Sequence, residues 1–353
     1  MSSDQPIEVD EHLTQLLEQQ KTLSKPFVSI EFFPPKTEVG VGSLYKVLEK
    51  LKGFKPLFAD VTWGAGGSTS DLTLELCQGI KSRGVTPNLH LTCTNMEKSL
   101  IDSALSSCKA SGITNILALR GDPPAGETVW HAADASLKCA LDLVNYIRKD
   151  YSKDEMCITV AGYPEGHPTA MVEVPSLNEL SPTELKRYSS SIDENGKETF
   201  LVCKDDAWKT EMNYLKQKID AGANVIITQM VFDPEVYDIF VKDCRAVGIN
   251  VPILPGIMCI SAYGGFKRMT TFCKSRVPLA VNRAIDEANK TLNDTEEALN
   301  EAKERVKAIG IDLVEDMCRK FIELGAPGLH FYTLNTSAAT TAICNRLSDD
   351  GTI

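Results

Sequence analysis

Arg120 and Asp122 stand on either side of a glycine, directly after an uninterrupted apolar run at residues 116–119. A short apolar run bounded by turn residues is typical of a strand buried on both faces. Two prolines follow, and because proline has no amide hydrogen they end the ladder there. A cation and an anion beside a glycine, which lets a ligand approach the backbone closely, could bind a polar ligand. An ion pair at the rim of a sheet accounts equally well for this stretch taken alone.

The same pattern, an apolar run that ends in polar, glycine or proline residues, recurs along the chain. Glu31 ends one run and is followed by Phe-Phe-Pro-Pro, Thr62 and Trp63 end another, and Gln229 ends a third. With the stretch above, eight strands are expected, at residues 27–35, 57–64, 89–94, 115–119, 157–164, 224–229, 251–256 and 328–334. Seven of the eight carry this signature at the carboxyl end, where functional residues are therefore expected.

Stretches with apolar residues at helical spacing alternate with these strands. They lie at residues 43–51, 70–84, 97–110, 135–149, 206–221, 234–247 and 262–275, with Ser43 and Ser70 as expected N-caps and Gly84 as a stop. Further helices are expected at 11–21 and 337–347, and two extra ones, 279–289 and 295–324, between the seventh and eighth strands. Strand followed by helix, eight times, predicts an α/β protein with parallel strands and crossover helices. No Gly-x-Gly-x-x-Gly follows the first strand and no Walker motif occurs, which favours a closed (β/α)8 TIM barrel over an open dinucleotide-binding sheet.

One barrel domain is expected at residues 26–349, after a polar and partly helical extension at 1–25 and before a tail at 350–353. A polar segment after the fifth strand, residues 178–203, is rich in turn residues and lacks apolar periodicity. This segment is expected to be a surface insertion, and a mobile decoration is favoured over a lid. Its deletion is expected to leave the protein folded.

The composition excludes several classes of protein. The 353 residues include 37 Lys and Arg against 48 Asp and Glu, and the net charge of −11 opposes general binding to nucleic acid or to an anionic membrane. No apolar run is long enough to span a membrane, and the first residues lack the basic and apolar regions of a secretion signal. The 11 cysteines form no Cys-x-x-Cys pair, so reduced thiols in a cytoplasmic protein are expected, with no metal site.

Eight motifs, in order and one at each strand, resemble the methylenetetrahydrofolate reductases. They begin at Glu31 (Glu-Phe-Phe-Pro-Pro-Lys), Asp60 (Asp-Val-Thr-Trp-Gly-Ala-Gly-Gly), His90 (His-Leu-Thr-Cys-Thr), Ala118 (Ala-Leu-Arg-Gly-Asp-Pro-Pro), Val160 (Val-Ala-Gly-Tyr-Pro-Glu-Gly-His-Pro), Ile227 (Ile-Thr-Gln), Leu254 (Leu-Pro-Gly-Ile) and Gly328 (Gly-Leu-His-Phe-Tyr-Thr-Leu-Asn). The resemblance covers residues 25–349 and is close to the catalytic domain of the eukaryotic enzymes. One such motif would be weak, but eight in register make the resemblance specific.

The resemblance implies an FAD-dependent oxidoreductase of one-carbon and methionine metabolism. In this family NADPH or NADH gives a hydride to FAD and leaves, and 5,10-methylenetetrahydrofolate then takes the hydride to become 5-methyltetrahydrofolate. Glu31 is implied to be the catalytic acid, and Asp122 to bind the pterin and place negative charge near the flavin. Gln229 and Tyr332 are implied to contact folate. The implied FAD contacts are Thr62, Trp63, His90, Arg120, Gly121, Asp122, Ala140, Tyr163, His167, Pro168, Thr169, Ala170 and Lys218.

The chemistry of Glu31 agrees with this role independently. The imidazolidine ring of the substrate must open before it accepts a hydride, and protonation of a ring nitrogen helps it to open. A carboxyl group among the apolar residues of a strand end is desolvated, which disfavours its charged form. Without the resemblance, a rim carboxylate in an ion pair is the better interpretation of Glu31. Taken alone, His90 and His167 are better interpreted as structural histidines, and Lys218 equally well as a solvated helix residue.

The sequence departs from the family's pattern at several positions. Cys139 stands where many relatives carry an aromatic neighbour of the flavin, and Glu211 where an aspartate contacts FAD. Thr336 stands where an arginine often binds folate, so recognition of the glutamate tail is expected to differ. Cys259 replaces a proline. FAD binding is still expected, with Cys139 and Glu211 at the cofactor and Thr336 at the substrate.

Two other functions are consistent with the sequence. A non-catalytic barrel that binds folate or a partner protein would carry no flavin, and the retained Glu31, Asp122 and Gln229 argue against it. Another flavin barrel, such as a proline-oxidising enzyme, would show no reoxidation of its flavin by the folate. The choice between NADPH and NADH stays open, as does assembly into a homo-oligomer.

Eukaryotic relatives carry, after the barrel, a second domain that binds S-adenosylmethionine and inhibits the enzyme. Here the closing helix expected at 337–347 is followed by a polar tail of only six residues, so no such inhibition is expected. Titration of S-adenosylmethionine into a steady-state assay tests this. A saturable, non-competitive fall in rate would contradict the expectation.

Overall fold

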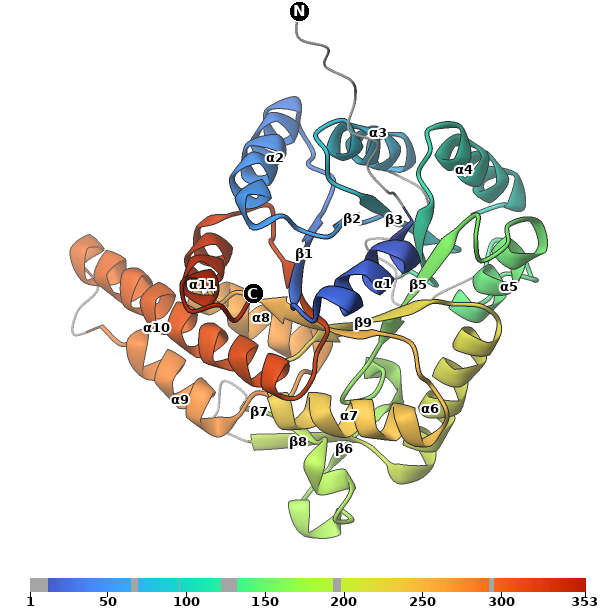
Figure 1. Ribbon diagram of the computed structural model, residues 1–353. Helices are drawn as coiled ribbons and strands as arrows, with labels where there is room; N and C mark the ends of the chain where they lie inside the picture. Colours follow the sequence, from blue (N-terminus) through green and yellow to red (C-terminus); the bar gives the residue numbers. More distant parts are fainter. Residues whose placement is uncertain (1–11, 65–68, 95, 122–131, 193–197, 292–294) are drawn as a thin grey trace, which may run out of the picture. The chain divides into compact units, whose positions relative to one another are not determined.

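Eight strands form a closed barrel in the order β1-β11-β10-β9-β5-β4-β3-β2 (Figure 1). The computed structural model describes residues 12–64, 69–94, 96–121, 132–192, 198–291 and 295–353, so Asp122 lies outside the described residues. The strands are β1 (Phe27–Phe32), β2 (Ala59–Val61), β3 (Pro87–Thr92), β4 (Asn115–Leu119), β5 (Cys157–Gly162), β9 (Val225–Met230), β10 (Ile253–Met258) and β11 (Gly328–Tyr332). The neighbouring strands pair in parallel, so the expected (β/α)8 fold is confirmed.

Helices alternate with the strands, as expected. They are α1 (Leu13–Leu23), α2 (Glu38–Leu51), α3 (Ser70–Lys81), α4 (Lys98–Ala110), α5 (Ala140–Asp150), α6 (Asp205–Asp220), α7 (Pro234–Ala246), α8 (Tyr263–Cys273), α9 (Leu279–Ala288), α10 (Glu296–Glu323) and α11 (Ala338–Asp349). Helices α9 and α10 are the extra pair expected between the last two strands. Within the described ranges, no helix is long and apolar enough to cross a membrane.

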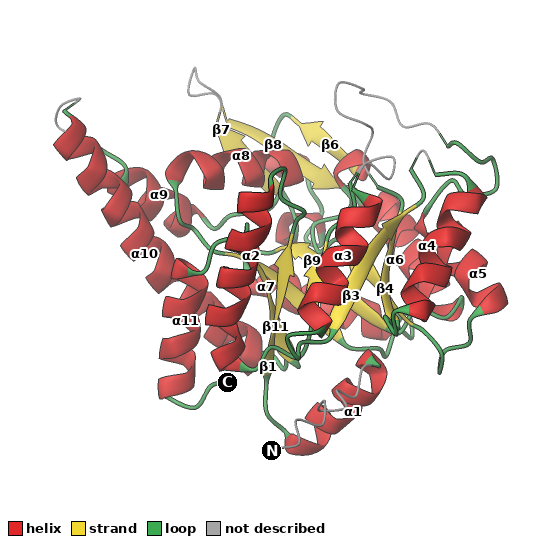
Figure 2. Ribbon diagram, turned by 90° about the horizontal axis from the view of Figure 1, so that it is seen from above, coloured by secondary structure: helices red, strands yellow, loops and turns green. Residues whose placement is uncertain are grey.

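The chain divides into two compact units. The first contains Met1–Ala161, Lys218–Ile226 and Thr333–Thr336, and the second contains Gly162–Gln217, Ile227–Tyr332 and Ser337–Ile353. In the first unit, α2, α3 and α4 lie along the outer side of β1 to β4 (Figure 2). Helix α1 is fixed at the amino ends of two strands, because the Asn115 side chain accepts a hydrogen bond from the Leu13 amide (2.8 Å) and donates one to the Pro87 carbonyl (3.1 Å).

Helix α2 begins earlier than the sequence indicates. Its N-cap is Thr37, whose side chain accepts a hydrogen bond from the Gly40 amide at 3.1 Å. Ser43 lies inside the helix, where its hydroxyl donates to the Val39 carbonyl at 2.9 Å. The expectation of Ser43 as N-cap is therefore wrong, because the glycines of the first turns contribute no apolar side chain to the helical pattern. Ser70 likewise lies within its helix, α3, one residue after the N-cap.

Helix α5 begins later than expected, at Ala140. The residues before it are held in a turn by two carboxylates. Asp134 accepts a hydrogen bond from the Ser136 amide at 2.7 Å, and Asp142 accepts one from the Lys138 amide at 2.9 Å. Short side chains that bond nearby amides compete with helix formation in this way. Helical periodicity alone does not reveal that competition.

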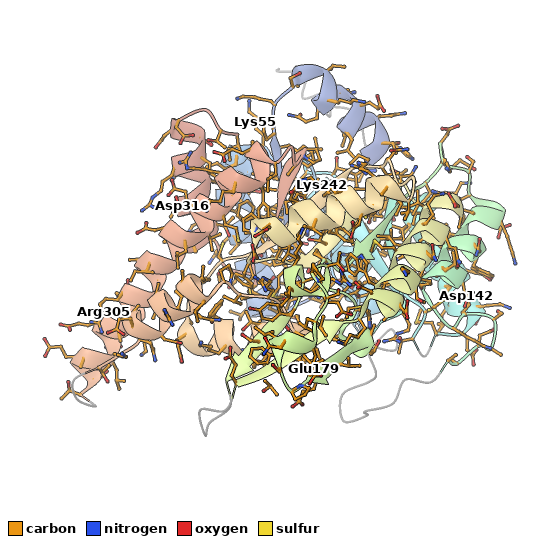
Figure 3. All side chains as sticks on the ribbon, turned by 90° about the horizontal axis from the view of Figure 1, so that it is seen from below. Lys55, Asp142, Glu179, Lys242, Arg305 and Asp316 are labelled. Atoms are coloured by element: carbon orange, nitrogen blue, oxygen red, sulfur yellow. The ribbon has the colours of Figure 1, made fainter. Side chains whose placement is uncertain are left out.

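In the second unit, α10 packs against its neighbours through polar and close backbone contacts. Arg305, labelled near one end of α10 in Figure 3, donates to the Ala288 carbonyl at the end of α9 (3.2 Å). Arg346 of α11 donates to Asp312 on α10 at 2.7 Å. Gly310 allows α10 to approach the loop after β10, because a Cβ there would lie 2.2 Å from the Ile260 carbonyl oxygen.

The polar segment after β5 forms a sheet of its own. Strands β6 (Met171–Val174), β7 (Ser189–Ile192) and β8 (Glu198–Cys203) pair antiparallel in the order β6-β8-β7. A small apolar cluster supports it, formed by Val174, Leu177, Leu180, Tyr188, Phe200 and Val202. The described residues of this segment are therefore regular structure with a small core, and the expectation of a mobile decoration stays a prediction. Its apolar residues are few, and they meet only when the short strands pair.

Arg187 anchors this sheet although the surrounding sequence is polar. Its side chain is 3% exposed and donates to the carbonyls of Cys203 (3.1 Å) and Thr183 (3.3 Å), and it also pairs with Asp205 at the start of α6. Arg276 donates to the Tyr188 carbonyl at 3.1 Å. The segment is therefore held to the rest of the second unit by buried polar contacts as well as by apolar packing.

We expect Arg187→Met to destabilise the protein by about 1–3 kcal/mol, because the substitution leaves buried carbonyls without their donor. Urea unfolding followed by circular dichroism measures the change. Val172→Thr is the matched control, since this β6 side chain is 48% exposed and its substitution should change stability by less than about 0.5 kcal/mol. An unchanged unfolding midpoint for Arg187→Met would contradict the anchoring role.

Deletion of residues 178–203 should lower the free energy of unfolding by more than either substitution.

Candidate functional site

Glu31, Asp60 and Asn88 lie side by side in three neighbouring strands of the first unit. The strand register pairs Glu31 with Asp60 and Asp60 with Asn88. Paired residues of adjacent strands project to the same face, and so do residues two apart along one strand. His90, two residues after Asn88, therefore shares that face. Register and alternation together bring three titratable side chains to one place.

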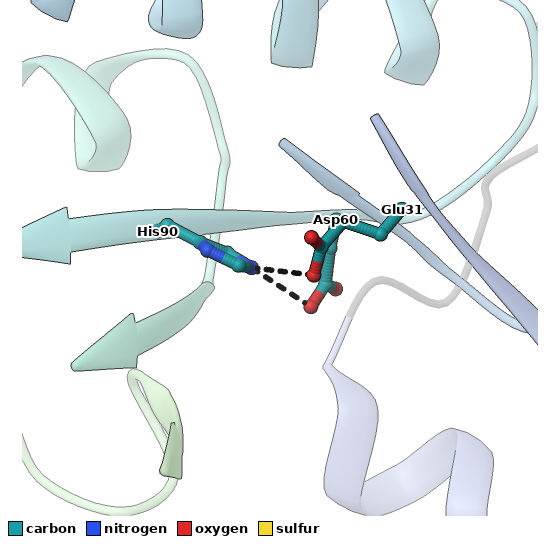
Figure 4. Close-up of side chains that lie close together, drawn as sticks. All are labelled: Glu31, Asp60 and His90. Atoms are coloured by element: carbon teal, nitrogen blue, oxygen red, sulfur yellow. Dashed lines mark hydrogen bonds and ion pairs between the residues drawn. The ribbon is translucent and has the colours of Figure 1, made fainter. Parts of the chain in front are cut away.

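The three side chains are in contact (Figure 4). The Nε2 atom of His90 lies 3.0 Å from Oδ2 of Asp60 and 3.5 Å from Oε2 of Glu31. The side chain of Asp60 is 0% exposed, that of His90 6% and that of Glu31 17%. Within the cluster, the carboxylate of Asp60 is fully buried, whereas solvent or a ligand can reach that of Glu31.

The two carboxylates change the proton affinity of His90. Burial of the imidazole opposes its charged form, but the hydrogen bond to Asp60 and the charges of Glu31 and Asp60 outweigh burial and raise the pKa of His90. His90 therefore keeps a second ring proton to higher pH than an ordinary histidine. The cluster can hold and position protons near neutral pH.

The same three ligand atoms lie within 4.8 Å of one another, close enough to hold one metal ion. Metal ligation needs the neutral imidazole, whereas the raised pKa of His90 favours the imidazolium. The arrangement suits proton sharing better than metal ligation near neutral pH. The expectation of no metal site stays a prediction.

The backbone of Glu31 is fixed by residues far along the chain. Its carbonyl accepts hydrogen bonds from the amide (3.2 Å) and the hydroxyl (2.7 Å) of Thr333. Next to it, Asn335 and Phe33 exchange two hydrogen bonds, from the Phe33 amide at 3.1 Å and to the Phe33 carbonyl at 2.8 Å. The position of the carboxyl group is therefore set by both ends of the first unit's sequence.

The corner after β4 is tightly built around Gly121. This residue has φ +89°, and a Cβ there would lie 2.7 Å from Oγ1 and 3.1 Å from Cβ of Thr94. The Thr94 hydroxyl and amide both donate to the Arg120 carbonyl, at 2.5 and 2.9 Å. The half-buried Arg120 donates from Nε to the Gly121 carbonyl at 3.3 Å. Packing against Thr94 therefore requires a glycine at this corner; Asp122, which follows, is not among the described residues.

Trp63 carries a polar atom that the described residues do not satisfy. The residue is 8% exposed, and its indole Nε1 is buried without a hydrogen-bond partner in the described part of the chain. A buried donor without an acceptor is costly and calls for an explanation. Thr62 before it is held through its amide, which donates to the Phe32 carbonyl at 2.9 Å. A ligand acceptor beside β2 would account for the indole.

The remaining expected cofactor residues of the first unit lie at helix α5 and on α6. Cys139 is the N-cap of α5 and Ala140 its first residue; the thiol of Cys139 donates to Asp142 at 3.4 Å. Lys218 is 4% exposed, and its ammonium donates to the Ala161 carbonyl at the end of β5 at 2.9 Å. The alternative of a solvated helix lysine is therefore excluded, because Lys218 is buried against a strand end.

In the second unit, the expected cofactor residues after β5 form a compact turn. Tyr163 and His167 meet edge to face with ring centroids 4.7 Å apart. His167 accepts a hydrogen bond from the Thr169 amide at 3.2 Å, and the Pro168 carbonyl accepts one from Lys274 at 2.6 Å. Ala170 ends the short 3-10 helix that Pro168 begins. Glu211, half-buried, lies on α6.

The expected folate residues divide between the units. In the second unit the Tyr332 hydroxyl donates to the Thr228 carbonyl at 2.6 Å, and the half-buried Gln229 accepts from the Met230 amide at 2.9 Å. A Cβ at Gly256 would lie 2.3 Å from that same Thr228 oxygen. In the first unit Thr336 is exposed and donates to the Thr333 carbonyl at 3.0 Å.

Sequence reasoning did not single out two buried carboxyl groups. Asp60 was visible only as the first letter of a motif, although it is the polar residue of an otherwise apolar strand. Glu165 lies in the motif after β5, accepts a hydrogen bond from the Arg276 amide at 3.0 Å, and burial raises its pKa to about 7. In the sequence, both Asp60 and Glu165 could have been identified as carboxyl groups placed between apolar or turn residues.

The family described as methylenetetrahydrofolate reductase matches residues 15–348 of this chain. The Arabidopsis thaliana protein named methylenetetrahydrofolate reductase (NADH) 1 is 42% identical over 320 residues, which are 90% of this chain and 48% of the plant protein. The Pectobacterium carotovorum protein named 5,10-methylenetetrahydrofolate reductase is 32% identical over 323 residues, 91% of this chain and 89% of the bacterial protein. The chain thus spans about half the length of the plant relatives it matches.

Among solved structures, an uncharacterized protein from Clostridium thermocellum that binds two copies of 5-methyl-5,6,7,8-tetrahydrofolic acid aligns with a TM-score of 0.54. The two chains are 15% identical, and the alignment covers 96% of this chain and 99% of that one. This likeness supports the fold. The match of the family over nearly the whole sequence shows that the chain belongs to the methylenetetrahydrofolate reductase family.

Proposed function

We propose that this chain reduces 5,10-methylenetetrahydrofolate to 5-methyltetrahydrofolate with NADPH or NADH, through FAD in a ping-pong reaction of one-carbon and methionine metabolism. The observation that carries the proposal is the contact of Glu31 with the buried His90 and Asp60 at the carboxyl ends of β1 to β3. The reaction needs a proton donor that stays protonated near neutral pH, and this cluster holds protons there. Membership of the family supplies the choice of substrate.

The residues of the first unit fit a flavin on two observations. Gly121 presents no side chain to a bound group, and a Cβ there would meet Thr94, while the buried Trp63 indole lacks an acceptor within the described chain. Thr62, His90, Arg120, Cys139, Ala140 and Lys218 of this unit would hold the cofactor, with Asp122. The residues of the second unit that would hold the cofactor are Tyr163, His167, Pro168, Thr169, Ala170 and Glu211. When bound, FAD takes a hydride from the nicotinamide and gives it to the folate.

The residues of this chain would bind and protonate the substrate. Glu31 gives a proton to a ring nitrogen of the folate, which opens the imidazolidine ring. Gln229 can donate to and accept from a pterin edge, and Tyr332 can contact the substrate beside it. Asp122 would accept a hydrogen bond from the pterin. Thr336 offers a hydroxyl where relatives often offer an arginine, so we propose weaker recognition of the glutamate tail.

The proposal extends to the setting of the enzyme. We propose a catalytic domain at residues 26–349 that acts in the cytoplasm on a folate and a pyridine nucleotide, without nucleic acid or membrane partners. Self-association into a homo-oligomer is compatible with the proposal. Anaerobic reduction of the flavin with each nucleotide, followed by reoxidation with methylenetetrahydrofolate, tests the function directly. A purified protein without flavin absorbance would refute it.

We expect Gly121→Ala to lower FAD affinity at least about tenfold, because the added methyl group meets Thr94 and displaces the corner from the cofactor. Flavin content and the dissociation constant, measured by fluorescence titration, report the change. Gly84→Ala is the matched control: Gly84 has a similar φ of +78° but nothing within 4 Å of its Cβ position. Equal flavin loss in both variants would show that backbone strain, and not the cradle, is responsible.

We expect Glu31→Gln to bind FAD and to accept electrons from NAD(P)H normally, but to reduce the folate about 100-fold or more slowly. The reason is that only the folate half-reaction needs the proton donor. Anaerobic stopped-flow measurements separate the two half-reactions. Glu235→Gln, an exposed glutamate on α7, serves as control. Normal folate-driven reoxidation in Glu31→Gln would exclude Glu31 as the acid.

A further inference from the structure

Asp60 has no task in the reaction as described so far, yet it is the most buried member of the cluster. It takes the shorter contact to His90, at 3.0 Å against 3.5 Å for Glu31, and its side chain is 0% exposed. A contact of 3.5 Å exceeds the usual N–H···O length, so the ring N–H of His90 points at Asp60. Burial of a carboxylate is unfavourable unless it is paired. Its presence beside the proton donor therefore calls for a reason.

Counting charges over the three groups supplies that reason. While Glu31 holds its proton, the hydrogen bond and the charge of Asp60 still favour the imidazolium of His90, and the cluster of ionised Asp60, protonated His90 and neutral Glu31 has no net charge. The cluster becomes negative when Glu31 loses its proton. Surroundings of low dielectric constant disfavour the uncompensated charge, so they favour the protonated Glu31. With an amide in place of Asp60, the neutral arrangement would be an ionised Glu31 beside a protonated His90. With Asp60 present, the imidazolium is paired with an ionised Asp60 and not with an ionised Glu31.

We propose that Asp60 is a positioning residue that neutralises His90 and thereby keeps the proton on Glu31. The proposal rests on the proposed function, in which Glu31 gives this proton to a ring nitrogen of the folate. As the carbon–nitrogen bond of the imidazolidine breaks, its electron pair stays on the nitrogen, which forms the new N–H bond. Glu31 then takes up a proton from solvent. Asp60 stays ionised and His90 stays protonated throughout, so neither transfers a proton.

The other groups recorded around this cluster in the described chain carry no competing charge. Cys77 of α3 faces Asp60, and burial raises the pKa of its thiol well above the ordinary range, so the thiol is neutral. Asn88, the register neighbour of Asp60, is an amide that donates to Thr159 at 3.0 Å. Thr333 donates only to the backbone carbonyl of Glu31. Of the described groups named here, only Glu31, Asp60 and His90 change the charge of the cluster.

The first test is the pH profile of the folate half-reaction in Asp60→Asn. We expect its midpoint to move at least one unit toward acid, a loss of about tenfold or more in rate at neutral pH. Flavin reduction by NAD(P)H should not change. Asp233→Asn is the control, because it also exchanges a largely buried carboxylate, paired with Arg276 at 2.8 Å, for an amide, but no imidazole is involved. An unmoved midpoint in Asp60→Asn would overturn the proposal.

The second test is a double-variant cycle that a merely structural role could not reproduce. Removal of the Asp60 carboxylate and removal of the imidazolium change the charge beside Glu31 in opposite directions, so Asp60→Asn combined with His90→Gln should return the midpoint toward that of the unaltered protein. If Asp60 only supports the fold, the double variant would be worse than either single one. A double variant whose midpoint stays as acid as that of Asp60→Asn would therefore overturn the proposal.

The third readout does not depend on turnover or on flavin. Infrared difference spectroscopy during a pH titration reports the band of a protonated carboxyl group, and its loss in Glu31→Gln assigns it to Glu31. We expect this band to persist to higher pH in the unaltered protein than in Asp60→Asn. Equal persistence in both would overturn the proposal even in an active enzyme. Failure of the folate reaction in the unaltered protein, with the band shift present, would instead refute the proposed function alone.

Discussion

The parallel register of β1, β2 and β3 is the constraint on which the site depends. It sets Glu31 beside Asp60 and Asp60 beside Asn88, and alternation along β3 adds His90 to the same face. No loop has to be positioned to bring these groups together. The buried hydrogen bond between His90 and Asp60 follows from that register, and with it the raised pKa of the imidazole. A slip of one residue in β2 would turn Asp60 away and remove the cluster.

Close backbone packing requires glycine at one position in each unit. At Gly121 a Cβ would meet Thr94, and at Gly256 it would meet the Thr228 carbonyl, which also accepts the Tyr332 hydroxyl. Gly84 shows that a left-handed backbone can occur without close packing, because no atom lies within 4 Å of its Cβ position. The difference between these glycines lies in what packs against them. That packing distinguishes Gly121 and Gly256 from an ordinary helix stop such as Gly84.

The strands and the barrel could be predicted from the sequence because buried parallel strands read as apolar runs with polar carboxyl ends. The position of Glu31 at such an end was predicted for the same reason, whereas His90 was singled out only by the resemblance to the family. Asp60 was not singled out, because β2 has only three residues and offers too short a pattern. The sheet of β6, β7 and β8 was missed because its apolar residues, such as Val174 and Val202, come from separate segments. The starts of α2 and α5 were missed because caps and turns depend on single side chains, not on periodicity.

The hydrogen bonds between Phe33 and Asn335 join residues separated by 302 positions. Thr333 holds the Glu31 carbonyl over the same separation. Contacts of such long range form late, because the entropy of closing the intervening loop must be overcome first. During synthesis, the ribosome releases β11 long after β1, so Glu31 cannot reach its final position until nearly all of these residues have emerged. Until then the edge of β1 that faces β11 in the strand order is without its partner, and an unpaired strand edge makes a partly folded chain prone to aggregation.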